Sequence, residues 1–271
     1  MTQENTDKYY NKVGEYFDLF ADKYYDRSIQ NPVLSAMRHS FRNHVTIQNP
    51  KYILDIGCGP GEDVIYFAEK YPYATVYGID VSAKMIDCAQ EIVASKGLKN
   101  IKLINTGIEN ISAHIGSDIQ FDIIYVFFGA LNTVSSLHNA AQVINNLLAP
   151  KGQVVLTFVN KYYLSEFFVN MLKGRIKKAT ARWGKEWQGY SPEAAISSKT
   201  YTPSQIKKVF AHMKFLRKEG YSIFYPAWYQ ANKIANRPSI GNMLYKMDKM
   251  ANKTPLWSNG EYTLFVYEKV D

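Results

Sequence analysis

The segment ILDIGCGPG at residues 53–61 decides the fold. An apolar run with one carboxylate, Asp55, leads into Gly57, Gly59 and Gly61, and a helical pattern follows directly. Glycine permits a tight turn and lets a ligand approach backbone atoms that a side chain would cover. A strand, a glycine turn and a helix in this order predict an α/β domain that binds a nucleotide-type ligand.

Short β-branched runs alternate with helical patterns after this loop. The predicted elements are strand 52–56, helix 61–71, strand 74–79, helix 82–95, strand 101–106, strand 121–127, helix 134–148 and strand 153–159. Such alternation is typical of parallel strands with helices on both faces of the sheet. Pro150, Lys151 and Gly152 are stop and turn signals, which we expect to separate the last helix from the last strand of this series.

The two ends of the chain follow other patterns. Apolar residues between Tyr9 and Tyr24 recur every three or four positions and predict one amphipathic helix. Residues 160–200 interrupt the alternation, and Thr202 with Gln205 forms a capping box that begins a new helix. The remainder is expected to contain a strand near 214–224, a helical excursion over 227–252 and a last strand from Tyr262 to Glu268.

The glycine loop differs from the dinucleotide-binding fingerprint. That fingerprint places its third glycine where this chain has Glu62, and Asp63 adds a second negative charge at a helix start where a pyrophosphate would lie. A ligand without phosphate is therefore favoured. Asp80 ends the second predicted strand, and a carboxylate there can accept both hydroxyls of a ribose. The alternative for Asp80 is a helix cap, for which Ser82 is better placed.

Together these motifs resemble the class I S-adenosylmethionine-dependent methyltransferase family, particularly the small-molecule branch that includes ubiquinone and menaquinone biosynthesis methyltransferases. The resemblance is good over residues 10–160 and looser beyond. It implies an α/β fold with a Rossmann-like, doubly wound, seven-stranded sheet, mostly parallel with an antiparallel last strand, and a helical lid insertion. The implied parts are an N-terminal helical cap (1–50), a cofactor-binding Rossmann-like core (51–160), the lid insertion (161–200) and the C-terminal part of the sheet with a second helical excursion (201–271).

The resemblance also implies roles for individual residues. The loop from Asp55 to Gly61 cradles the methionine part of the cofactor, Asp80 binds its ribose, and Met85 lines one face of its adenine. Phe127 offers its backbone to the cofactor's amino group. The implied cofactor-binding residues are Asp55, Gly57, Cys58, Gly59, Gly61, Asp80, Val81, Met85, Gly107, Ile108 and Phe127. The implied cofactor is S-adenosyl-L-methionine, and no metal is expected.

One position departs from the family pattern. After the third strand the family usually has Gly-Asp, and the Asp accepts from the adenine amino group, whereas this chain has Gly107 in place of the acidic residue. Adenine recognition is then expected to rest on a backbone carbonyl or on water. Ile108 can still pack on the ring, although both Ile108 and Met85 also suit a hydrophobic core.

Few side chains need be catalytic in such an enzyme. A sulfonium methyl group is already activated, so its transfer mainly requires in-line positioning, exclusion of water and a place for the acceptor's proton. The candidates for a base are His138, on the helix after the fourth strand, and Tyr24 or Tyr25, at the end of the first helix. A single histidine on a helix is more often a surface or capping residue.

The insertion reads as a basic amphipathic helix. Leu164, Phe167, Phe168, Met171 and Leu172 share one face, and Arg175, Lys177, Lys178, Arg182 and Lys185 follow. Such a helix can act as a lid, lie on an anionic membrane surface or simply pack on its own domain. The first two roles favour a small, apolar or aromatic acceptor. By analogy with the family, Trp183, Trp187 and Tyr190 are expected to line the acceptor pocket.

Composition and charge narrow the class of protein. An apolar share of 46% with 21% charged residues is typical of a globular chain, and two cysteines exclude a disulfide framework. The charged N-terminus does not resemble a signal peptide, and polar residues interrupt the uncharged stretch 123–150, so a cytoplasmic protein is expected. Residues 1–160 have a net charge of −3 and residues 161–271 one of +11, which indicates an anionic partner or a solvated basic surface.

Three other functions each agree with part of the sequence. A nicotinamide dehydrogenase would need the dinucleotide loop that Glu62 and Asp63 disfavour. A nucleic-acid methyltransferase suits the basic half, but the Asn/Asp-Pro-Pro-Tyr motif of base methylation is absent at residues 127–130, so a nucleic-acid partner is not expected. A catalytically silent cofactor-binding protein would explain Gly107. The expected partner is therefore a small-molecule acceptor, with the membrane surface as a peripheral contact.

Overall fold

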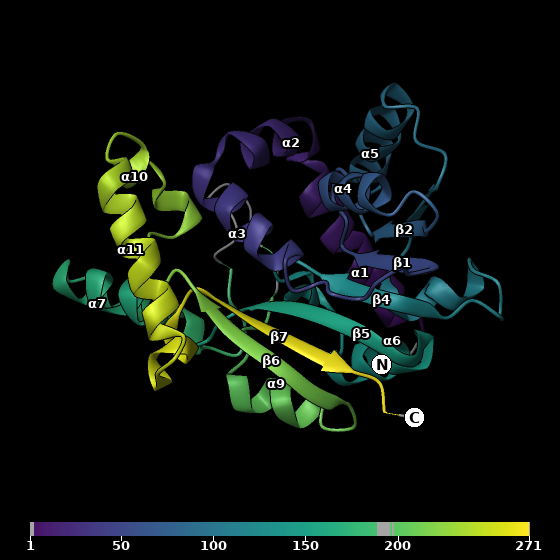
Figure 1. Cartoon of the computed structure of the whole chain (residues 1–271). Coiled ribbons are helices and arrows are strands. Elements are labelled where there is room, and N and C mark those ends of the chain that lie inside the picture. Colours follow the sequence, from purple (N-terminus) through teal and green to yellow (C-terminus); the bar gives the residue numbers. More distant parts are fainter. Residues whose placement is uncertain (1–2, 189–195, 197, 271) are drawn as a thin grey trace.

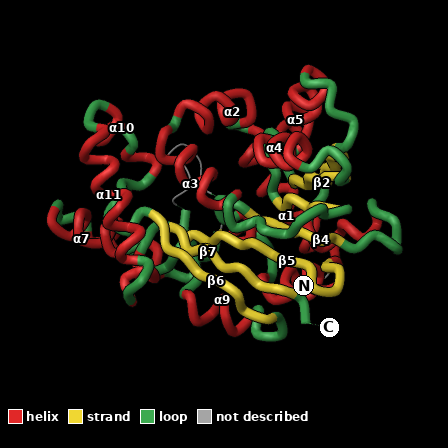
Figure 2. The backbone as a smooth tube through the Cα atoms, viewed as in Figure 1, coloured by secondary structure: helices red, strands yellow, loops and turns green. Residues whose placement is uncertain are grey.

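A seven-stranded sheet forms the centre of the computed structural model, which describes residues 3–188, 196 and 198–270 (Figure 1, Figure 2). The strand order is β3-β2-β1-β4-β5-β7-β6. The strands are β1 (Tyr52–Ile56), β2 (Thr75–Asp80), β3 (Ile101–Asn105), β4 (Phe121–Val126), β5 (Leu148–Val159), β6 (Lys214–Tyr221) and β7 (Tyr262–Glu268). β1 to β5 pair in parallel, whereas β7 runs antiparallel to both β5 and β6. The predicted fold class and the antiparallel last strand are confirmed.

Helices cover both faces of this sheet. The helices are α1 (Gln3–Asp18), α2 (Ala21–Gln30), α3 (Pro32–Arg42), α4 (Glu62–Lys70), α5 (Ala83–Ser95), α6 (Leu137–Leu147), α7 (Leu164–Leu172), α8 (Ile176–Ala179), α9 (Pro203–Val209), α10 (Asn232–Ala235) and α11 (Pro238–Ala251). Short 3-10 helices are η1 (Ile108–Ala113), η2 (Ala130–Thr133), η3 (Ala181–Trp183), η4 (Trp228–Gln230) and η5 (Pro255–Asn259). Among the described residues, no helix is long and apolar enough to span a bilayer.

Neighbouring residues of the central strands build two separate cores. Leu54 and Ile124 belong to a core that α6 and α9 close on one face of the sheet. Ile53 and Ile123 belong to a second core, closed by α3 and α4 on the other face (Figure 1). Successive side chains of a strand point to opposite faces. A strand covered on both faces therefore consists almost entirely of apolar residues, which is the pattern that predicted this sheet.

The predicted single N-terminal helix is wrong, because the chain bends after α1. Leu19 and Phe20 separate α1 from α2, and Phe20 has no side-chain cap. The ring of Phe20 nevertheless packs against that of Tyr16, with 5.3 Å between centroids. The apolar spacing thus continues through the bend, so periodicity alone could not reveal it. α3 then begins at Asn31, whose side chain accepts the backbone N–H groups of Val33 and Leu34.

A second prediction was wrong at the start of β5. The strand begins at Leu148 and passes through Pro150, Lys151 and Gly152, which were expected to form a turn. Lys151 has a φ of 61°, and the register between β4 and β5 shifts between Phe121 and Ile123. A β-bulge accommodates residues that ordinarily end a strand, because the bulged strand bends and its pairing with the neighbouring strand then continues.

The N-terminal helices are fixed to the carboxyl edge of the sheet. A Cβ atom at Gly14 would lie 2.6 Å from the carbonyl oxygen of Val81, so α1 approaches the end of β2 more closely than any side chain would allow. The carboxylate of Asp18 then accepts from the Ser82 hydroxyl (2.5 Å) and from the Lys84 backbone N–H (3.2 Å). α1 is therefore anchored directly beside Asp80.

Buried charges attach the insertion to the carboxyl end of β5. The guanidinium of Arg182 is ion-paired with Glu166, donates to the carbonyl of Asn160 (3.3 Å) and lies 4.0 Å from a carboxyl oxygen of Glu261. Burial raises the pKa of Glu261 to about 8, because the nearby guanidinium only partly offsets the loss of water. We therefore expect the attachment of the insertion to depend on pH.

We expect Glu261→Gln to flatten the pH dependence of stability. The pKa of Glu261 rises on folding from 4.5 to about 8, so its contribution to stability is complete below 4.5 and is lost as pH rises towards 8. Gln does not ionise. As the pH rises through this window, the free energy of unfolding of the variant should therefore increase relative to that of the native chain by up to about 1.4 kcal/mol per pH unit. Urea unfolding at pH 5 and pH 8 measures the difference. Glu268→Gln, at the last residue of β7, is the control. The same change of stability with pH in Glu261→Gln and in the native chain would disprove the assignment.

Candidate active site

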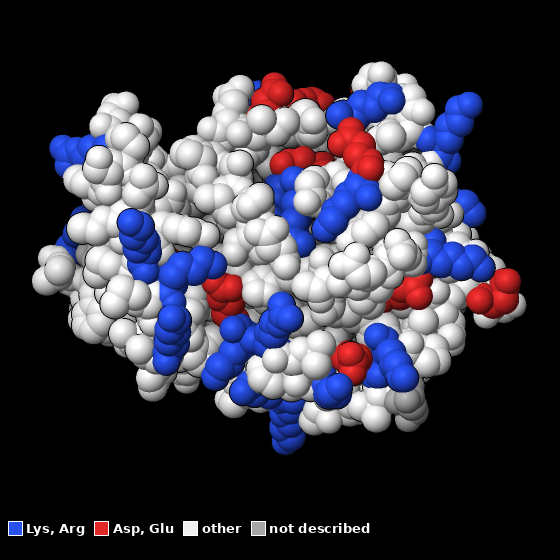
Figure 3. Space-filling view, in the orientation of Figure 1, with Lys and Arg blue, Asp and Glu red and all other residues white. Residues whose placement is uncertain are grey.

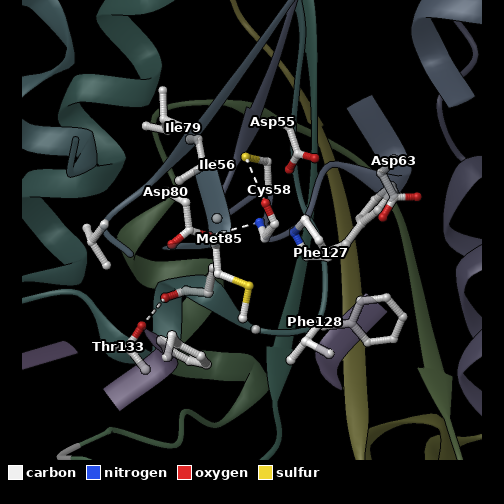
Figure 4. A pocket seen from close by; sticks show the side chains of 18 of the residues that line it. Asp55, Ile56, Cys58, Asp63, Ile79, Asp80, Met85, Phe127, Phe128 and Thr133 are labelled. Atoms are coloured by element: carbon white, nitrogen blue, oxygen red, sulfur yellow. Dashed lines mark hydrogen bonds between the residues drawn. The ribbon is translucent and has the colours of Figure 1, made fainter. Parts of the chain in front are cut away.

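A cavity of about 200 Å³ opens at the carboxyl ends of β1, β2 and β4. Open α/β sheets bind their ligands at this edge, where the strand order reverses. All of the residues that sequence assigned to the cofactor line this cavity except Gly61. Figure 4 shows Asp80 and Met85 on one side of the glycine loop and Asp55, Asp63 and Phe128 on the other.

The first two glycines of the loop have different structural roles. Gly57 has a φ of 77°, and a Cβ there would lie 2.4 Å from the Cβ of Ala130, so the turn has no room for a side chain. The backbone N–H groups of Gly57 and Cys58 both donate to the carbonyl of Ile79 (2.8 and 3.0 Å). Gly59 has a φ of 52°, but a Cβ there would have no atom within 4 Å. Gly59 therefore leaves open space for a ligand on the cavity side of the turn.

Asp80 connects this turn to the start of α5. One carboxylate oxygen accepts the Gly59 backbone N–H and the other accepts that of Ser82, both at 2.9 Å. Each oxygen has a second lone pair, which leaves an acceptor for each hydroxyl of a diol. Ser82 itself caps α5 by accepting the Met85 N–H (3.1 Å). Burial raises the pKa of Asp80, and the backbone N–H groups oppose that rise.

Asp55 lies deeper, at the base of the cavity. Its side chain is 3% exposed, and its pKa is raised well above the usual range, first by burial and then by the nearby Asp63 carboxylate. The ring of Tyr125, which is fully buried, lies beside it, and the pKa of that phenol is likewise raised by burial. A buried carboxyl whose charge is so poorly solvated favours a cationic ligand group at this point.

The two acidic residues at the start of α4 are neutralised from α3. Arg38 is ion-paired with Asp63 and with Glu62 (3.0 Å), and Arg42 lies 2.7 Å from Asp63. The repulsion of a phosphate at this helix start is therefore smaller than the unpaired carboxylates would cause. The Arg38 guanidinium also lies 4.7 Å from the centroid of the Phe128 ring.

Carboxyl groups nevertheless outnumber cations among the described residues that line the cavity. Its ionisable carboxylates are Asp55, Glu62, Asp63 and Asp80, and Arg38 is the cation among the described lining residues. The complete chain, in contrast, has a formal net charge of +8. A concave site lined by one sign of charge attracts the opposite sign. Because Arg38 and Arg42 already pair with Glu62 and Asp63, the carboxyl groups left for a cationic group of a ligand are Asp55 and Asp80.

Tyr10 explains the glycine that departs from the family pattern. A Cβ at Gly107 would lie 3.1 Å from the Tyr10 ring, so this aromatic side chain of α1 occupies the space of the missing acidic residue. The hydroxyl of Tyr10 donates to Glu109, which also accepts from the Ser135 hydroxyl (3.1 Å). Ile108 and Met85 are 2% exposed and line the same end of the cavity.

A strained turn after β4 presents aromatic rings to the cavity. Phe128 has a φ of 53° and Gly129 one of 78°, so two successive residues adopt the left-handed conformation. The side chain of Asn132, which is fully buried, accepts the Val159 N–H (2.9 Å) and donates to its carbonyl (3.2 Å), which joins this turn to β5. A non-glycine residue in this conformation persists only when its surroundings hold it there.

Several lining residues were not predicted. The covering wall comes from α1 to α3 and includes Tyr10, Phe17, Phe20 and Arg38, while Trp228 and Tyr262 come from the far end of the chain. Asn31 donates to the carbonyl of Trp228 (2.9 Å) and so joins the two ends. The resemblance implied an N-terminal helical cap over residues 1–50, but it did not indicate which side chains of that cap reach the cavity. Trp228 and Tyr262 have no local signal.

Other predicted site residues lie elsewhere. His138 is exposed on α6 and does not line the cavity, whereas Tyr24 does. No described residue of the insertion 161–200 lines the cavity, and its role as a lid stays a prediction, because residues 189–195 and 197 lie outside the described part of the chain. Trp183 stacks on Phe167 (4.9 Å) within the insertion, whereas Trp187 lies over Arg182 (4.5 Å) and is buried in the core that also contains Phe127 and Tyr262. Neither indole lines the cavity. Tyr190 falls outside the described residues.

Comparison with known proteins agrees with this geometry. A family model described as "Methyltransferase domain" matches residues 47–224. The chain belongs to this family. The methyltransferase is 29% identical over 184 residues to the demethylmenaquinone methyltransferase of Geobacillus sp. (strain WCH70), and the match covers 62% of this chain and 74% of that protein. The family model and these relatives together show that the chain is an S-adenosylmethionine-dependent methyltransferase.

Solved structures share the fold of this methyltransferase. The [4+2]-cyclase SpnF has a TM-score of 0.66 and 16% identity over 96% of both chains. The N-methyltransferase NodS from Bradyrhizobium japonicum, solved with S-adenosyl-L-homocysteine, has a TM-score of 0.57 and 13% identity over 97% of this chain and 99% of its own. At such identities the likeness concerns the fold alone.

We expect Gly59→Ala to weaken cofactor binding while the chain still folds. The added methyl group projects into open cavity space, and its backbone strain at positive φ costs about 1 kcal/mol. The affinity for S-adenosyl-L-homocysteine should fall about tenfold, because the ligand must shift from the turn. Calorimetry measures the affinity. Gly174→Ala is the control, because Gly174 also has a positive φ and open space around it. Equal affinities in the two variants would show that the cofactor does not lie against the turn at Gly59.

Proposed function

We propose that this methyltransferase transfers the methyl group of S-adenosylmethionine to a small apolar or aromatic acceptor. The observation that supports the acceptor class is the aromatic wall of the cavity. This wall consists of Phe17, Phe20, Tyr24, Phe128, Trp228 and Tyr262. Aromatic rings provide apolar contact area and stack on a flat acceptor. A relative named demethylmenaquinone methyltransferase agrees with such an acceptor.

The residues present fit the cofactor. Gly59 leaves space at the turn, Asp80 has a free lone pair on each oxygen for the ribose diol, and Asp55 offers a poorly solvated carboxyl to a cationic group. Met85 and Ile108 supply apolar surface for the adenine. The bound cofactor supplies an electrophilic methyl group on a sulfonium. The excess of carboxylates in the cavity favours its positive charge.

The protein's own work is to orient the acceptor, exclude water and take up a proton. The wall from α1 to α3 covers the cavity and excludes water from the reacting groups. Because His138 is exposed outside the cavity, Tyr24 is the stronger candidate for the group that, as a phenolate, receives the acceptor's proton. It lies half-buried on α2, within the aromatic wall.

We expect Tyr24→Phe to lower kcat about a hundredfold with the cofactor affinity unchanged, since general acid–base groups contribute effects of this order. The rate of labelled-methyl incorporation, measured across pH, checks this. Tyr25→Phe is the matched control, because Tyr25 is the next residue of the same helix and does not line the cavity. A Tyr24→Phe enzyme with the native rate and pH profile would remove Tyr24 from the mechanism.

One experiment tests the proposed function as a whole. Calorimetry should show binding of S-adenosyl-L-homocysteine and none of NADH. The purified protein is then incubated with cofactor labelled in its methyl group and with a metabolite extract, and labelled products are identified by mass spectrometry. We expect label in an apolar or aromatic compound. Label in RNA, or binding without any labelled product, would contradict the proposal.

A further inference from the structure

The outer side of α11 has an exposed apolar stripe. Ile240, Met243, Met247 and Met250 are 41%, 54%, 37% and 70% exposed. At about 100° per residue these four positions fall within an arc of about 80°. The helix is held on the domain through other residues, namely Gly241, Asp248 and Ala251, which are buried. An aligned row of exposed apolar side chains marks an interaction surface, and methionine adapts readily to its partner.

Cations border this α11 stripe. Lys246 and Lys249 lie on the adjoining arc, Arg237 precedes the helix and Lys253 follows it. Lys249 is ion-paired with Glu219 (2.6 Å). Arg237, Lys246 and Lys253 form no ion pair with any residue that the structure describes. Their charges are therefore available to an anionic partner.

Acidic residues are nearly absent from this segment. Between residues 224 and 260 the sequence contains one, Asp248. Asp248 is 5% exposed, and its carboxylate accepts the backbone N–H groups of Ile223, Phe224 and Tyr225. It does not offset the surface charge of the stripe. Figure 3 shows Lys and Arg side chains spread over α11, β6 and α9 with few acidic ones between them.

The same combination of residues occurs on α7 and α8. α7 has no buried residue, and Phe168, Leu172 and Ile176 are 57%, 88% and 62% exposed. Between Glu166 and Glu186 the sequence has no acidic residue, and the exposed cations there include Lys173, Arg175, Lys177 and Lys178. We call this the α7 patch. Figure 1 places α7 at the same end of the molecule as α10 and α11.

We propose that the α11 stripe and the α7 patch bind an anionic membrane surface. Apolar side chains of an interfacial helix enter the boundary of the acyl chains, while Lys and Arg remain at the headgroups and attract anionic lipids. Nucleic acid would use the cations but leave the exposed methionine and leucine side chains without a partner. The lipid surface uses both features. This inference is independent of the acceptor and of the cofactor.

Vesicle co-sedimentation with the full chain tests this inference. We expect binding to vesicles of equal parts phosphatidylcholine and phosphatidylglycerol and none to phosphatidylcholine alone. Binding should weaken as salt is added, because charges are screened beyond about 10 Å at 0.1 M. Absence of binding to the mixed vesicles, or equal binding to both kinds, would overturn the proposal. So would capture of RNA or of an acidic protein together with failure to bind vesicles.

Variants identify the surface. Met247→Glu combined with Met250→Glu should weaken vesicle binding at least tenfold, and Lys246→Gln combined with Lys253→Gln should weaken it about tenfold, since each cation near such a surface contributes severalfold. Leu172→Glu combined with Ile176→Glu should also weaken it. Tyr73→Glu is the matched control, because Tyr73 is 99% exposed in the turn between α4 and β2. Unchanged melting temperatures verify folding, and native binding by the α11 variants would overturn the proposal.

Discussion

Gly57→Ala is expected to destabilise the folded chain by about 3 kcal/mol or more. The new methyl group would lie 2.4 Å from the Cβ of Ala130 in a turn whose φ is 77°. Relief of this contact would move η2 away from the turn, and it would strain the hydrogen bonds from Gly57 and Cys58 to the Ile79 carbonyl. Urea unfolding measures the loss of free energy.

Gly97→Ala separates backbone strain from steric overlap. Gly97 has a φ of 66°, but a Cβ there would meet no atom within 4 Å. Its substitution should cost only about 1 kcal/mol, which is the cost of the left-handed conformation alone. If both variants lose the same free energy of unfolding, Ala130 moves away from the new methyl group at little cost. In that case the requirement for glycine at position 57 would lie in its φ.

Asp80→Asn is expected to weaken the binding of S-adenosyl-L-homocysteine by about 1 to 3 kcal/mol, which corresponds to about five- to 150-fold. The amide keeps the size of the carboxylate and retains one acceptor for the Ser82 N–H. It loses the charge and the second acceptor, which hold Gly59 and the ribose diol. Calorimetry measures the affinity.

The matched control removes a carboxylate of the same kind outside the cavity. Asp118 is exposed and does not line the cavity, so Asp118→Asn should leave the affinity unchanged. Melting temperatures of both variants show whether the glycine loop survives. If Asp80→Asn binds the ligand as tightly as the native chain does, the role of Asp80 is limited to its hydrogen bonds with the backbone of Gly59 and Ser82.

The centre of the fold could be predicted because its residues act locally. Ile53, Leu54 and their neighbours form a continuous apolar run, Gly57 and Gly59 mark the turn, and Ser82 caps the next helix. Each of these signals depends on a few adjacent residues, and both faces of the sheet are buried. The bend between α1 and α2 was missed, because the spacing of apolar residues continues through it.

The candidate site was predicted only on its cofactor side. Asp80 and Gly59 belong to one short motif, so their meeting in space follows from the strand order. Arg38, Tyr10 and Trp228 reach the cavity from helices whose direction the sequence pattern does not encode. The indoles of Trp183 and Trp187 were assigned to the acceptor pocket by analogy, but Trp183 stacks on Phe167 and Trp187 lies over Arg182, and neither lines the cavity.

The hydrogen bond between Asn31 and Trp228 has an evolutionary consequence. It joins two segments from opposite ends of the chain that both line the cavity, whereas the glycine loop comes from a segment between them. On the proposed function, mutations in either terminal segment would change the aromatic wall of the cavity and so the acceptors that fit, with the central loop left intact. Exchange of residues 10–38 and 228–262 between homologous enzymes is therefore a practical route to altered selectivity, provided that both segments are exchanged together.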